Sequence, residues 1–215
     1  MTVVNDTYTG HVDAGTAARR TLPAATIVKA SVGPMDNNAY LITCSATGKT
    51  LLIDAANDGP ALVELIRSQA PDVELIVTSH QHFDHWQALA EVAEATGAPT
   101  AAHALDAEPL PVKPDRILAD GDTITVGDLT FDVIHLQGHT EGSVALALRG
   151  AASLALSGGR TPAGQGLTRR FGRHPPHVAW HVDYRPLRPR RPEGPADHRR
   201  RQADHLSGDG RGRGR

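Results

Sequence analysis

Short apolar runs alternate with turns rich in Gly, Pro, Asn and Asp along the first three quarters of the chain. Apolar and β-branched runs bounded by such turns are typical of strands, and apolar residues spaced three and four apart are typical of helices. We therefore predict strands at residues 25–31, 39–44, 50–54, 73–77, 97–102, 123–126, 129–136 and 152–158, and helices at 59–67 and 87–95. The first three of these strands follow one another directly, which predicts an antiparallel meander.

The pattern changes after Gly159, where apolar periodicity disappears and Arg, Pro and Gly dominate. Residues 1–159 contain 8 Lys and Arg against 19 Asp and Glu, a net charge of −11, whereas residues 160–215 contain 14 Arg against 5 acidic residues, a net charge of +9. We predict a loose lead-in at residues 1–24, a folded domain at residues 25–158 and a largely disordered tail at residues 159–215.

The single cysteine, Cys44, excludes an intramolecular disulfide and a cluster of thiolate metal ligands. Residues 1–20 lack the apolar segment of a secretion signal, and no stretch of the chain approaches the length of a membrane span. The default expectation is a cytoplasmic protein without a membrane partner.

The densest group of candidate ligands lies between the strand predicted at 73–77 and the helix predicted at 87–95. Within six residues the chain carries three histidines and a carboxylate: His80, His82, Asp84 and His85. Imidazole and carboxylate together suit Zn²⁺ and related ions. Residues two apart in an extended turn point the same way, so His80 and His82 can share one metal, while Asp84 and His85 can hold a second metal or tune the first. The alternative, an ordinary solvated loop, is disfavoured by four potential ligands at a strand end.

This spacing, His-X-His-X-Asp-His, resembles the signature of the metallo-β-lactamase-fold metallo-hydrolase superfamily, and in particular its glyoxalase II-like members. The resemblance extends from about Ala25 to Ser157. It implies an α/β fold, an αββα sandwich with the metal site between the edges of its two sheets. Because the tail lacks strand and helix patterns, we expect the second half of this sandwich to be incomplete.

Two earlier segments, Asp-Asn-Asn-Ala-Tyr-Leu at 36–41 and Leu-Leu-Ile-Asp at 51–54, are also similar to segments of this family. The resemblance implies that Asp54 lies behind the metal ligands and supports them. A helix cap or an ordinary turn residue is an equally open interpretation of Asp54.

A second motif, Gly-His-Thr-Glu-Gly-Ser at 138–143, resembles the family segment that supplies the third histidine of the first metal site. The resemblance implies that His139 is a metal ligand. Gly138 and Gly142 would let the backbone wrap closely around an ion. We expect His103 to be solvated, and His135 to be a packed or rim residue rather than a ligand.

The resemblance fails after the strand predicted at 152–158. The family continues with Gly-Asp, whose Asp bridges two metals, but here Gly158 is followed by Gly159 and no carboxylate occurs before Asp183. Our hypothesis is that the chain beyond about Gly159 is translated out of the ancestral frame. With suitable codons, reading one base later restores Ser-Gly-Asp-Ala-Leu there and Tyr-Pro-Gly-Thr at 206–210, where the family has Tyr-Pro-Gly-His. The rival hypothesis is a natural basic tail.

The resemblance implies a zinc-dependent hydrolase in which His80, His82 and His139 hold one Zn²⁺ and a metal-bound hydroxide attacks a carbonyl. Asp84 would orient the water or accept its proton and, with His85, form part of a second site. The expected substrate is a small molecule: a thioester, lactone, ester, amide or β-lactam, with a hydroxyacylglutathione thioester as the first to try. One zinc is expected, and a second would bind weakly without the bridging Asp.

Two alternatives stay open. The first alternative to the hydrolase is a truncated relic that binds metal without turnover, and the second is a nucleic-acid-processing member that uses its basic tail. Few aromatic side chains accompany the arginines in the tail, namely Phe171, Trp180 and Tyr184. This scarcity of stacking surfaces disfavours nucleic acid as a partner.

Overall fold

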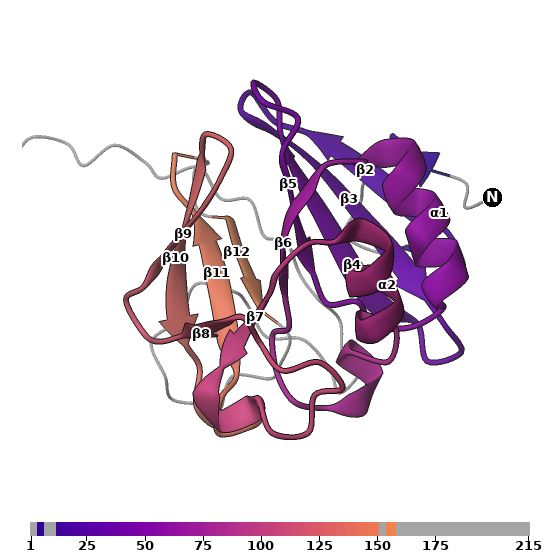
Figure 1. Cartoon of the computed structure of the whole chain (residues 1–215). Coiled ribbons are helices and arrows are strands. Elements are labelled where there is room, and N and C mark those ends of the chain that lie inside the picture. Colours follow the sequence, from indigo (N-terminus) through magenta and orange to yellow (C-terminus); the bar gives the residue numbers. More distant parts are fainter. Residues whose placement is uncertain (1–3, 7–11, 151–153, 158–215) are drawn as a thin grey trace, which may run out of the picture. The chain divides into compact units, whose positions relative to one another are not determined.

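The computed structural model describes residues 4–6, 12–150 and 154–157, which form two β-sheets and two α-helices (Figure 1). The strands of the first sheet lie in chain order: β1 (Val4–Asn5), β2 (Ala17–Thr21), β3 (Ala25–Val32), β4 (Asn37–Cys44), β5 (Thr50–Ile53), β6 (Val73–Val77), β7 (Thr100–His103) and β8 (Arg116–Leu118). The second sheet has the order β12 (Leu154–Ser157), β11 (Val144–Leu148), β10 (Leu129–His135) and β9 (Thr123–Val126).

The first sheet changes from antiparallel to parallel pairing at β5. Strands β3 to β5 form the predicted antiparallel meander, which β2 extends by pairing with β3, and β5 to β8 pair in parallel. Parallel neighbours need a crossover, and the helices α1 (Gly59–Gln69) and α2 (Leu89–Thr96) supply it between β5 and β6 and between β6 and β7. The carboxyl ends of β5, β6 and β7 therefore meet at one edge, where α/β sheets hold their ligands.

Local sequence explains where α1 begins and where α2 ends. The Asp58 carboxylate accepts a hydrogen bond from the Ala61 N–H at 3.3 Å, and Pro60 lies in the first turn of α1. Helix α2 is capped by Gly97, whose φ of +67° is left-handed and whose N–H donates to the Ala93 carbonyl at 2.8 Å.

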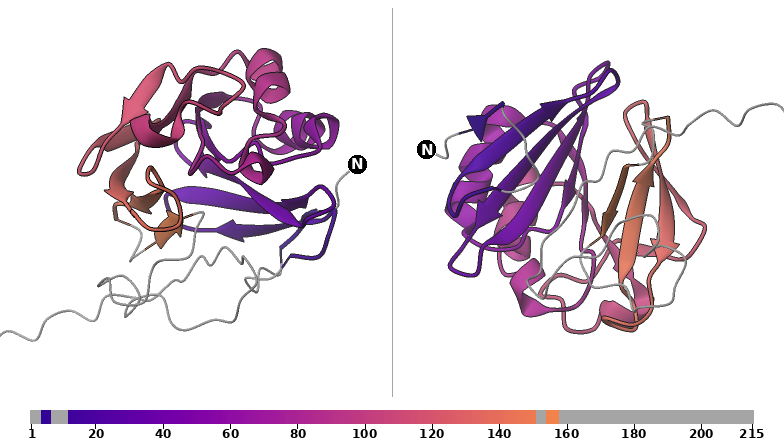
Figure 2. Two further views of the ribbon diagram at one scale, coloured as in Figure 1. Left: turned by 90° about the horizontal axis from the view of Figure 1, so that it is seen from below. Right: turned by 180° about the vertical axis from the view of Figure 1, so that it is seen from behind.

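Two apolar cores follow from the alternation of side chains along the strands. On β3, Ile27 faces a core shared with the second sheet, whereas Val28 faces a core shared with the helices. From the second sheet, Phe131 and Leu146 belong to the first of these cores. Figure 2 shows the helices on one face of the first sheet and β9 to β12 on the other. The predicted α/β class is confirmed: one helical layer and two sheets form three layers of an αββα sandwich. The expectation that the second half of the sandwich is incomplete concerns residues outside those the structure describes.

The main difference from prediction is in the stretch expected to be a loose lead-in. There β2 pairs with β3 along its whole length, from Ala17 opposite Ala30 to Thr21 opposite Thr26. The small residues Ala17 and Ala18 are buried, while Arg19 and Arg20 give the segment a polar appearance that hid the strand. The short strand β8 and the strand β11 were not predicted either. The prediction of a disordered tail and the hypothesis of a frame change concern residues 159–215, which lie outside the described part.

Candidate metal centre

Three histidine side chains from two distant segments meet at the carboxyl edge of the first sheet. His80 and His82 follow β6, and His139 lies in the turn between β10 and β11. One ring nitrogen from each lies within 4.8 Å of the others. The His139 Nε2 atom is 3.0 Å from His82 Nδ1 and 3.2 Å from His80 Nε2. Zn–N bonds of about 2.0–2.1 Å at tetrahedral angles separate ligand nitrogens by about 3.3 Å, so the three rings fit a zinc ion.

The hydrogen bonds of Ser79 assign the tautomer of His80. The Ser79 hydroxyl donates its one proton to Asp54 Oδ2 at 2.8 Å, and it lies 3.0 Å from His80 Nδ1. His80 Nδ1 must therefore carry the ring proton and donate it to Ser79 Oγ. This leaves the lone pair of His80 on Nε2, the atom that faces His139.

Asp54 is fully buried and holds His85 as well. Its Oδ2 atom accepts from His85 Nδ1 at 2.9 Å, and its Oδ1 atom accepts from the Ser79 N–H at 2.7 Å. The backbone turns sharply here, with a φ of +60° that is uncommon outside glycine. Both contacts support the interpretation of Asp54 as a residue behind the ligands, rather than a simple cap.

Asp84 and His85 lie beside the three converging rings. His85 Nε2 is 3.7 Å from Asp84 Oδ2, and the His85 and His80 ring centres are 4.0 Å apart. The Asn37 side-chain amide donates to Asp84 Oδ2 at 2.9 Å. Asn37, at the start of β4, therefore fixes the orientation of the candidate base.

Burial and repulsion between rings lower the pKa of two of the three converging imidazoles, His80 and His139. Burial is the main reason that the pKa of His80 falls from 6.5 to about 2, and the nearby His85, His139 and His82 lower it further. Burial, followed by repulsion from His82 and His85, also lowers the pKa of His139. Neutral rings offer lone pairs at physiological pH, which is the state that binds a metal.

The centre opens to solvent on one side. His80 is buried, His139 is partly exposed and His82 is exposed. Three nitrogen ligands with one accessible face leave room for a water or substrate atom, as in catalytic rather than structural zinc sites.

Other residues flagged in the sequence take different places. His103 was expected to be solvated, but its ring stacks on that of His135, with centroids 4.3 Å apart and planes inclined by 20°. His135 Nε2 donates to the Glu141 carbonyl at 2.7 Å. Neither belongs to the group of three.

Gly142 packs closely against a carboxylate. A Cβ atom on Gly142 would lie 2.7 Å from Asp106 Cγ. Sequence reasoning missed Asp106, as it missed Ser79 and Asn37, because the partners of these polar side chains come from distant strand ends. Their position at strand termini was the one available signal.

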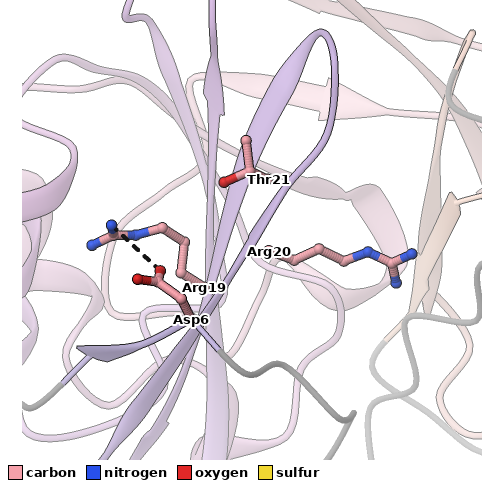
Figure 3. A pocket seen from close by; sticks show the side chains of 4 residues that line it. All are labelled: Asp6, Arg19, Arg20 and Thr21. Carbon is pink, nitrogen blue, oxygen red and sulfur yellow. Dashed lines mark ion pairs between the residues drawn. The ribbon is translucent and has the colours of Figure 1, made fainter.

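A hollow of about 640 Å³ lies elsewhere, along β2, lined by Asp6, Arg19, Arg20 and Thr21 (Figure 3). Arg19 Nη1 lies 3.5 Å from Asp6 Oδ1, and Arg19 Nη2 donates to Gln69 Oε1 at 2.6 Å. Figure 3 shows the Arg19 and Arg20 side chains pointing in opposite directions. The hollow shares no lining residue with the histidine centre.

In the described part of the chain, no helix has the length and apolarity needed to span a membrane.

Solved structures of similar fold are metallo-β-lactamases. The class B3 enzyme BLEG-1 is 25% identical, with a TM-score of 0.53 over 58% of this chain and 68% of the enzyme. A metallo-β-lactamase of Cronobacter sakazakii with a HARLDQ motif is 23% identical, with a TM-score of 0.54 over 67% of this chain and 62% of that one. At this identity the second match shows the fold alone.

Curated relatives are similar to more than half of this chain. A hydroxyacylglutathione hydrolase of Fuscovulum blasticum is 39% identical over 123 residues, which are 57% of this chain and 47% of the relative. The protein of the same name from Rhodospirillum rubrum is 35% identical over 140 residues, which are 63% of this chain and 52% of the relative. The chain thus spans about half the length of these relatives.

The model of the metallo-beta-lactamase superfamily matches residues 32–158, which include both histidine segments. Fold, histidine centre and this match agree, and the chain belongs to the metallo-beta-lactamase superfamily.

Proposed function

We propose that this chain is a zinc-dependent hydrolase of a small carbonyl compound, with one zinc ion held by His80, His82 and His139. The observation that carries the proposal is the convergence of three imidazole nitrogens, at separations of 3.0 and 3.2 Å, on one accessible side of the fold. A zinc ion held there supplies a Lewis acid for the carbonyl and lowers the pKa of water toward neutrality.

Asp84 is the proposed general base. Its carboxylate lies beside the histidine centre, and the Asn37 amide holds it at 2.9 Å. The side chain is 22% exposed, so it can reach a water molecule that attacks the substrate and accept its proton. Asp84 and His85 together also offer two of the ligands for a second, weaker metal site.

Asp54 is the proposed support for this centre. Support comes from its hydrogen bonds: Asp54 contacts His85 directly at 2.9 Å and contacts Ser79 at 2.8 Å, and Ser79 lies 3.0 Å from His80. Such contacts fix the ring plane and the tautomer of a ligand, and their loss commonly lowers metal affinity by about 10–100-fold.

We propose a hydroxyacyl thioester of glutathione as the substrate class. Support comes from the names of the relatives, hydroxyacylglutathione hydrolases that are 39% identical over 123 residues and 35% identical over 140 residues. A thioester carbonyl is also a suitable target for water activated beside a zinc ion.

The test is release of free thiol from a hydroxyacylglutathione by the zinc-loaded chain. We expect hydrolysis above the zinc-only rate, and a loss of about 100-fold or more in Asp84→Asn, because the amide cannot accept the proton. Asp128→Asn, in the exposed turn between β9 and β10, is the matched control and should keep the rate. A wild-type rate in Asp84→Asn would contradict the role of the base. A chain that binds zinc but releases no thiol would be a metal-binding relic.

A further inference from the structure

Asp106 is a buried carboxylate that connects the two segments carrying the histidines. It lies three residues beyond the end of β7 and is 1% exposed. Its two oxygens accept hydrogen bonds from three donors, one on the segment after β6 and two on the turn before β11.

The first donor is the peptide between two of the converging histidines. The N–H of Gln81, which separates His80 from His82, donates to Asp106 Oδ2 at 3.1 Å. The carbonyl of the same residue accepts from Trp86 Nε1 at 2.8 Å. Because this residue is held on both sides, the direction in which its two neighbours leave the backbone is fixed.

The other two donors flank the third histidine on its carboxyl side. The Thr140 hydroxyl donates to Asp106 Oδ2 in a short hydrogen bond, and the Gly142 N–H donates to Oδ1 at 2.8 Å. The Ser143 hydroxyl lies 2.7 Å from Thr140 Oγ1, which closes the network. The approach is so close that a Cβ atom on Gly142 would lie 2.8 Å from the Asp106 backbone nitrogen.

We infer that Asp106 is a positioning residue for the metal centre. Its carboxylate holds the His80–His82 segment and the His139 turn at the separation that zinc requires. The inference rests on the proposed zinc site but concerns a residue that does not itself reach the metal. Bonding to both segments from one carboxylate explains how rings 57 and 59 residues apart in sequence keep contacts of 3.0 and 3.2 Å.

A purely structural role predicts a different result. If Asp106 only closed a loop, its loss would lower the free energy of unfolding and leave the zinc affinity of the folded chain unchanged. Asp115 provides the matched control, because its Oδ2 atom accepts from the Thr100 N–H at 2.8 Å and the Thr100 hydroxyl at 3.2 Å, at the opposite end of β7.

The experiment compares the full chain with Asp106→Asn and Asp115→Asn, using zinc alone in a calorimetric titration and cobalt(II) alone as a spectroscopic probe. The amide places its NH₂ group against the N–H of Gly142 or of Gln81, so at least one backbone donor loses its acceptor. We expect the zinc Kd to rise about tenfold or more in Asp106→Asn, with a changed visible spectrum of bound cobalt, and to stay unchanged in Asp115→Asn.

An unchanged Kd and an unchanged cobalt spectrum in Asp106→Asn would overturn the inference. That result would not contradict the proposed zinc site. A wild-type chain that binds no zinc would instead overturn the proposed function, and this inference with it. If Asp106→Asn does not fold, Thr140→Val removes one donor and should still raise the Kd several-fold, whereas a wild-type Kd in that variant would overturn the inference.

Discussion

Asp54 is a buried carboxylate that supports the histidine centre without contacting any of its three converging rings directly. It accepts from the Ser79 N–H, the Ser79 hydroxyl and His85 Nδ1, so its removal leaves these donors buried without an acceptor. The resemblance to a family identified Asp54 in the sequence. Its partner Ser79 could not be predicted, because local spacing does not show which residues distant in sequence form a hydrogen bond.

For Asp54→Ala we expect a loss of about 2–4 kcal/mol in the free energy of unfolding, measured by urea denaturation of the metal-free chain. Asp58→Ala is the control, since Asp58 also has a positive φ, of 49°, but caps α1. Loss of that cap should cost about 1 kcal/mol and should not change zinc affinity. Equal effects of both substitutions on zinc affinity would contradict the role given to Asp54.

The lowered pKa of His80 makes the metal-free chain sensitive to acid. The folded state resists protonation down to a pKa of about 2, whereas the unfolded chain takes up the proton near 6.5. The contribution of neutral His80 to the free energy of unfolding is therefore complete above pH 6.5. It falls by about 1.4 kcal/mol for each pH unit below that value. Urea denaturation with a chelator at pH 7.5 and 5.5 should show a larger loss for the wild type than for His80→Gln. The same loss in both would contradict this origin.

At the scale of elements, hydrophobic periodicity predicted both helices and most strands within a few residues. It failed at β2, where polar arginines accompany small buried alanines, and at β11, whose apolar run joins the second histidine motif directly. The layering of helices and sheets came from the family resemblance, because periodicity does not say which faces pack together. Periodicity gave no role to Asp106, since its partners lie in the segment after β6 and in the β10–β11 connection.

Gly142→Ala tests the close packing of that turn. The new Cβ atom would lie 2.8 Å from the Asp106 backbone nitrogen, so the two loops must move apart. We expect a loss of about 1–3 kcal/mol in the free energy of unfolding, together with weaker zinc binding. Gly97→Ala is the control: it meets no atom within 4 Å, and its φ of +67° should cost about 1 kcal/mol without changing zinc affinity. Unchanged zinc affinity in both variants would contradict the coupling.

At the scale of the whole molecule, the match to the superfamily model ends at residue 158, next to the point where the apolar pattern of the sequence stops. The domain limits of 25–158 and the hypothesis of a changed frame after Gly159 stay predictions. The strand β2 shows that ordered structure begins before residue 25.

The nucleotide sequence of the gene tests the frame hypothesis. Read one base later from the codon of Gly159, it should encode Ser-Gly-Asp-Ala-Leu and continue as an open frame with strand and helix patterns. Stop codons soon after that point in the shifted frame would contradict the hypothesis and favour a natural basic tail.

The central claim is a single zinc site built by His80, His82 and His139, and elemental analysis of the purified chain tests it most directly. We expect about one zinc per chain in the wild type and a loss of that zinc in His139→Ala, because two histidines alone form an incomplete site. The control is His103→Ala, which removes a histidine outside the group of three and should keep the metal. A wild-type chain without zinc, or equal zinc content in His139→Ala, would contradict the account.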